Sequence, residues 1–91
     1  MKTYLISYDL VGNENITDYK RLIEMIKTAT YWAKPLKSVW LVKSTLSSAQ
    51  IRDQLRTVMD NNDKLLVIEI TNNWGSYNLP KDVTDWMQKG M

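Results

Sequence analysis

The sequence limits the chemistry open to this chain, because two of the most versatile catalytic side chains are missing. It contains neither histidine nor cysteine, which excludes imidazole acid–base catalysis, imidazole or thiolate metal ligation and any disulfide partner. Zinc fingers, cysteine proteases, Ser-His-Asp hydrolases and histidine-based nucleases are therefore ruled out. Any catalysis must use carboxylates, hydroxyls, lysine, arginine or a hard metal ion.

Asp9 is the strongest candidate for such chemistry. It closes a stretch of residues 2–10, K-T-Y-L-I-S-Y-D-L, whose alternating β-favouring side chains predict a first strand. A carboxylate at the end of a strand suits Mg²⁺, which binds one or two carboxylates and keeps several waters. In the competing interpretation, Asp9 only caps the next turn through the backbone N–H groups of Asn13 or Asn15.

The distribution of charge gives a second candidate site. The net charge is only +2, but the segment 20–43 carries six basic residues against one acid, Glu24. Such a segment forms either a solvated helix face and hairpin edge or a surface for phosphate groups. Its lysines alternate with Trp32 and Trp40, which suits a single-stranded nucleic acid, although tryptophan also fills protein interfaces. The candidate nucleic-acid contacts are Lys34, Lys37, Lys43 and the hydroxyl of Ser38.

The elements that position these residues follow from hydrophobic spacing. Ninety-one residues predict a single domain, with a core over residues 2–71 and an extension over 72–91. After a turn at Val11–Asn15, apolar residues recur at helical spacing from Ile16 to Ile26. A second helix begins with a capping box, in which a hydroxyl at Ser47 is followed three residues later by Gln50.

The remaining elements are strands and a helical tail. Residues 31–45 predict two strands with a tight bend near Trp40–Val42 and an edge or bulge at Pro35, which cannot donate to a ladder. Residues 64–71 predict an apolar strand, and a short helix follows Pro80. The order is βαββαβ, which is a ferredoxin-like α+β arrangement. Its helices leave one sheet face to be covered, so we expect a homodimer.

Several short motifs resemble the CRISPR-associated Cas-two family. They cover residues 2–71, and their order and spacing carry the resemblance more than any one of them does. The tail over residues 74–86 is similar to stand-alone, SinR-named relatives of that family. The matching motifs are Tyr8-Asp9-Leu10, Ser38-Val39-Trp40, the step Leu46-Ser47 into a helix, and Asp60-Asn61-Asn62-Asp63 before the apolar strand.

The resemblance implies a ferredoxin-like homodimer in which the two copies of Asp9 face each other and hold Mg²⁺. It implies phosphodiester hydrolysis of RNA or DNA, or a nuclease-derived dimer that binds nucleic acid. Alternatives within the same fold are a non-catalytic scaffold dimer and a toxin-type ribonuclease similar to the VapD relatives. The sequence departs from the family pattern by carrying Lys34, Pro35 and Lys37 where arginines are usual, and lysine lacks the planar fork of arginine.

The cellular location is predicted from two absences. The sequence holds no apolar run long enough to cross a membrane and no evident signal peptide. We therefore expect a cytoplasmic protein without a membrane partner.

Overall fold

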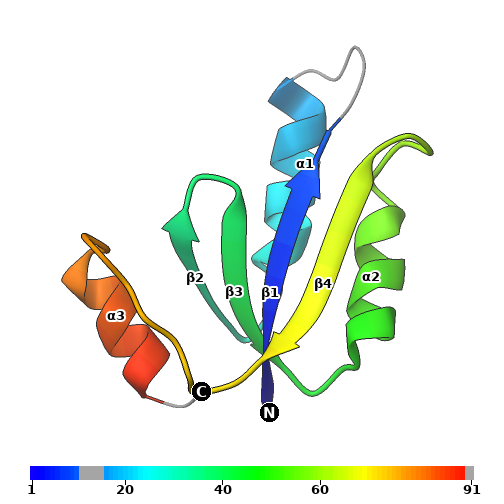
Figure 1. Cartoon of the computed structure of the whole chain (residues 1–91). Helices are drawn as coiled ribbons and strands as arrows, with labels where there is room; N and C mark the ends of the chain where they lie inside the picture. Colours follow the sequence, from blue (N-terminus) through cyan, green and yellow to red (C-terminus); the bar gives the residue numbers. More distant parts are fainter. Residues whose placement is uncertain (11–15, 90–91) are drawn as a thin grey trace.

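The structure is a computed structural model that describes residues 1–10 and 16–89. Within these residues four strands and two helices follow one another in the predicted βαββαβ order, and a third helix ends the series (Figure 1). The turn predicted at Val11–Asn15 lies outside the described residues. Over the described ranges every helix is too short or too polar to cross a bilayer. The elements are β1 Lys2–Asp9, α1 Ile16–Ile26, β2 Tyr31–Leu36, β3 Val39–Ser44, α2 Ser48–Arg56, β4 Lys64–Ile70 and α3 Lys81–Gln88.

The four described strands form one antiparallel sheet in the order β2-β3-β1-β4. The first strand is central and pairs with β3 on one side and with β4 on the other. The strands β2 and β4 therefore form the two edges. Because β1 and β4 run in opposite directions, Asp9 at the end of β1 lies opposite Lys64 at the start of β4.

The predicted bend near Trp40–Val42 is wrong. The chain turns earlier, at Lys37 and Ser38, and β3 continues through Trp40–Val42 without interruption. The prediction of an edge or bulge at Pro35 is confirmed, because β2 is an edge strand and its register against β3 shifts between Ala33 and Leu36. A proline that cannot donate to the ladder is tolerated at such a position.

The helices α1 and α2 cover one face of the sheet. Alternate residues of a strand point to the same face, so Tyr4 and Ile6 of β1 meet Trp40 and Val42 of β3 on this side. Trp40 is only 2% exposed, and its indole Nε1–H donates to the hydroxyl of Tyr8 over 3.3 Å. The buried core of this face consists of Tyr4, Ile6, Leu22, Ile26, Trp40, Val42, Ile51 and Leu55.

The predicted capping box at the start of α2 is confirmed. The hydroxyl of Ser47 accepts from the backbone N–H of Gln50 over 3.1 Å, and the side chain of Gln50 accepts from the backbone N–H of Ser47 over 2.9 Å. Two backbone donors that no turn of the helix could satisfy are thereby paired. The cap fixes the point at which the chain leaves β3 and enters α2.

The helix α3 covers only part of the opposite sheet face. Val83 and Met87 of α3 pack on Leu41 of β3, and the partly buried Leu5, Ile70, Trp74, Leu79 and Trp86 surround them. On β4, in contrast, Leu66 is 55% exposed and Ile68 is 47% exposed. We call this uncovered part of the face, made by Ser7, Asp9, Leu66 and Ile68, the open strip.

Candidate functional site

Asp9 lies in the open strip with its side chain exposed to solvent. It is the last residue of β1, and the alternation of the strand places it on the same face as Leu5 and Ser7, away from α1 and α2. No described residue forms a hydrogen bond or ion pair with its carboxylate. No described side chain therefore competes with a ligand for this group. The alternative role of Asp9, as a cap for the backbone of Asn13 or Asn15, lies outside the described residues.

A groove of about 490 Å³ lies beside Asp9. The hydroxyl of Ser7 donates to the carbonyl oxygen of Ser38 over 3.1 Å, so the turn between β2 and β3 lies against β1. The structure thus brings two of the predicted site residues, Asp9 and Ser38, into one groove. Its lining is Ser7, Tyr8, Asp9, Ser38, Lys64, Leu65 and Leu66.

Lys64 is a component of this groove that the sequence analysis missed. Its Cα is the register partner of Asp9 across the β1–β4 ladder, and no ion pair joins the two described side chains. The signal was available in principle, because an antiparallel pairing of the first and last strands puts the start of one opposite the end of the other. The groove therefore presents a carboxylate, an ammonium group and hydroxyls.

The three predicted phosphate-binding lysines do not form a single patch. The ammonium of Lys34 lies 4.9 Å from the ring centroid of Trp40, on the side of α1 and α2. The ammonium of Lys43 lies 4.6 Å from the ring centroid of Trp86, on the side of α3. Lys37 lies in the turn between β2 and β3. The pleat of the sheet thus separates cations that are close in the sequence.

Among the described residues, the groove offers a metal ion one carboxylate, that of Asp9. Within residues 1–10 and 16–89 no group of three or more acidic side chains is close enough to hold a metal ion. The other lining residues in the described part of the chain are not acidic. Because Mg²⁺ can be held by one or two carboxylates together with water, a second copy of Asp9 would complete a reasonable donor set.

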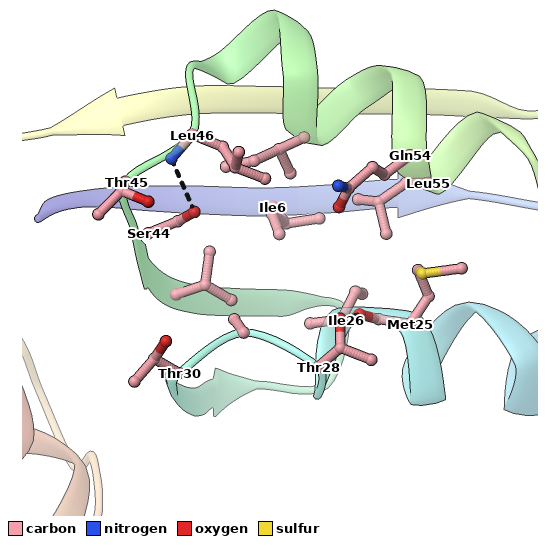
Figure 2. A pocket seen from close by; sticks show the side chains of 13 residues that line it. Ile6, Met25, Ile26, Thr28, Thr30, Ser44, Thr45, Leu46, Gln54 and Leu55 are labelled. Atoms are coloured by element: carbon pink, nitrogen blue, oxygen red, sulfur yellow. Dashed lines mark hydrogen bonds between the residues drawn. The ribbon is translucent and has the colours of Figure 1, made fainter.

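A second hollow, of about 260 Å³, lies between α1 and α2 (Figure 2). Its floor is aliphatic and its rim carries threonine and serine, with no charged residue among the side chains that line it. Two of the hydroxyls that line it form hydrogen bonds within the chain. Thr28 donates to the carbonyl of Met25 over 2.6 Å, and Ser44 accepts from the backbone N–H of Leu46 over 3.0 Å. The side chains that line this hollow in the described residues therefore include no acid–base pair.

The sequence matches no protein-family model. Among solved structures, the chain is similar to the crystal structure of a hypothetical protein, TT1823, from Thermus thermophilus. The TM-score is 0.67 at 18% sequence identity, over 87% of this chain and 94% of the other. At this identity the similarity shows a shared fold and nothing further, which agrees with the α+β architecture of four antiparallel strands and three helices in the described residues.

Proposed function

We propose that this chain is a ferredoxin-like homodimer that hydrolyses phosphodiester bonds of nucleic acid with Mg²⁺ bound between two copies of Asp9. The strand order β2-β3-β1-β4, with α1 and α2 on one face, supports the ferredoxin-like assignment. The observation that carries the functional proposal is the position of Asp9, which is exposed and lies directly beside uncovered apolar side chains.

The dimer is argued from the open strip. Leu66 and Ile68 expose about half of their surface on a sheet face, and contiguous apolar surface of this kind marks an interaction site. A twofold contact uses the same surface on both copies. Because Asp9 belongs to the open strip, a dimer formed through it would bring the two carboxylates toward each other.

The chemistry is argued from the groove. Asp9 would hold the metal ion, which when bound lowers the pKa of a coordinated water and stabilises developing negative charge on the phosphate. Lys64 would contact a phosphate oxygen as a point charge. The hydroxyls of Ser7 and Ser38 would orient a phosphate oxygen or a water through hydrogen bonds. Each of these groups lines the same groove.

The proposal is tested by measuring cleavage of labelled single-stranded RNA and double-stranded DNA, with Mg²⁺ and with chelator. Wild type and Asp9→Asn are compared, and the oligomeric state of both is measured by sedimentation. The expected result is cleavage by wild type that is lost in chelator and in Asp9→Asn, with the dimer intact in both proteins. Cleavage that survives the substitution, or that needs no metal, would remove Asp9 from the role of metal ligand.

A second candidate function is a non-catalytic homodimeric interaction module. The observation that favours it is that the described lining of the groove holds one carboxylate, Asp9, whose register partner across the ladder is a cation, Lys64. A stable wild-type dimer without cleavage would support this candidate, and salt-dependent binding would show whether nucleic acid is its partner. A toxin-type ribonuclease is a narrower form of the first proposal, and cleavage restricted to the RNA substrate would identify it.

A further inference from the structure

Two aromatic side chains are exposed next to each other at the start of the edge strand β2. Tyr31 is 53% exposed and Trp32 is 40% exposed. They point to opposite sides of the sheet, because neighbouring residues of a strand alternate: Tyr31 is the register partner of Lys43, and Trp32 is that of Val42. Exposed aromatic surface is therefore present on both sides of this edge.

The buried ring of Trp40 packs against the ring of Trp32. Its ring lies 5.5 Å from that of Trp32, centroid to centroid, at an interplanar angle of 58°. Since Trp40 is buried in the core, it cannot itself meet a ligand. It does restrict the ring of Trp32, which nevertheless stays 40% exposed.

Lysines surround the two exposed rings. The ammonium of Lys27 lies 4.8 Å from the centroid of Trp32, and that of Lys43 lies 5.9 Å from the centroid of Tyr31. Lys34 lies against Trp40 on the same face as Trp32, whereas Lys43 and Tyr31 lie on the opposite face. None of the three lysines forms an ion pair with a described carboxylate. Aromatic rings thus hold the cations in place without neutralising their charge.

From these contacts we infer that the edge at β2 binds a single-stranded nucleic acid, using both faces of that edge. On one face a base would stack on Trp32, with phosphates contacted by Lys27 and Lys34, and on the other face a base would stack on Tyr31, with a phosphate contacted by Lys43. Single-strand sites combine ring faces for stacking with cations for the backbone. A duplex keeps its base faces inside the helix and cannot use such rings. An acidic peptide would meet the lysines but brings no flat ring to stack. The inference deepens the proposed function, on which it rests, by naming the substrate class.

The edge strand also leads toward the groove at Asp9. From Tyr31 and Trp32, β2 runs to Leu36, and the turn at Lys37 and Ser38 follows. Ser38 lines the groove together with Asp9. In Figure 1 the β2–β3 turn lies at the same end of the sheet as the end of β1. A strand of six residues spans about 20 Å, so a short single strand lying along β2 would reach the groove.

The test is fluorescence anisotropy of a labelled twelve-nucleotide oligouridine and of an RNA duplex of equal length, both with chelator present so that no metal-dependent cleavage occurs. Wild type should bind the single strand more tightly than the duplex. Trp32→Ala and Tyr31→Ala should each weaken single-strand binding roughly tenfold to a hundredfold, the range of one lost stacking contact. Trp32→Phe should retain most of the affinity, because it keeps a ring.

Lys34→Gln should lower the slope of log affinity against log salt by about 0.7, the value for one phosphate contact on a single strand. Arg56→Gln is the matched control, because Arg56 lies on α2, which packs beside β4 at the other edge of the sheet, and its slope should equal that of wild type. Circular dichroism checks that each variant is folded. Tyr31→Ala and Lys34→Gln keep the test valid should Trp32→Ala fail to fold.

Equal affinity for duplex and single strand would overturn the inference, as would full affinity in a folded Tyr31→Ala variant. Competition by oligoglutamate as effective as competition by unlabelled oligouridine would also overturn it, because charge alone would then explain binding. These outcomes are separate from those for Asp9. Single-strand binding without cleavage would leave the edge site standing and remove the hydrolase, whereas duplex cleavage without single-strand binding would do the reverse.

Discussion

Asp9 and Lys64 are register partners across the β1–β4 ladder, one at the end of the first strand and the other at the start of the last. The groove therefore carries a negative and a positive side chain directly opposite each other on adjacent strands. A cation beside a carboxylate opposes the binding of a second cation, and it attracts a phosphate. The same lysine would therefore weaken metal binding while it strengthens substrate binding.

Lys64→Gln should tighten Mg²⁺ binding at Asp9 by about twofold to fivefold at low ionic strength, because it removes a positive charge beside the carboxylate. The same variant should bind nucleic acid more weakly. Isothermal titration calorimetry measures the first effect, with Arg56→Gln as the control for a cation removed elsewhere. Unchanged or weaker Mg²⁺ binding in Lys64→Gln would contradict the arrangement of the groove.

Leu66→Asp and Ile68→Asp should each convert the proposed dimer into a folded monomer. A carboxylate placed in an apolar twofold contact meets its own copy, so the substitution adds both desolvation and like-charge repulsion. Sedimentation velocity over a range of protein concentrations measures the change. Tyr19→Asp is the control, because Tyr19 is an exposed aromatic residue on α1, outside the open strip. A dimer that persists in both β4 variants would exclude the open strip as the interface.

Ser47→Ala should lower the free energy of unfolding by about 1 kcal/mol, the usual cost of losing a hydroxyl cap. Urea unfolding followed by circular dichroism measures the difference. Ser48→Ala is a matched control, since Ser48 is the neighbouring residue inside the first turn of α2 and alanine is favourable in a helix. A loss of stability as large in Ser48→Ala as in Ser47→Ala would show that the capping box is not the source.

Much of the fold could be predicted because local signals and tertiary packing agree. The apolar spacing of α1 is the spacing that buries Leu22 and Ile26 in the observed core. The capping box at Ser47 specifies where α2 begins whatever the helix later packs against. The turn at Lys37 and Ser38 could not be located, because the segment offers no glycine or asparagine to mark it.

The candidate site was harder to predict, because its residues meet through pairing between distant strands. Lys34 and Lys43 are nine positions apart in the sequence, yet they lie on opposite faces of the sheet, against Trp40 and Trp86 respectively. Conversely, Asp9 and Lys64 are far apart in the sequence and are neighbours in the sheet. The strand register decides which of these side chains become neighbours. Counting charges along the sequence does not reveal that register.

The partial cover that α3 gives to the sheet has a consequence for assembly. Because Val83 and Met87 occupy the surface over Leu41, a second molecule has access to the β4 side of that face but not to its centre. The symmetry axis of any face-to-face pair is thereby displaced toward β4. The C-terminal helix, though it contributes no residue to the groove, would then set how far apart two such grooves stand.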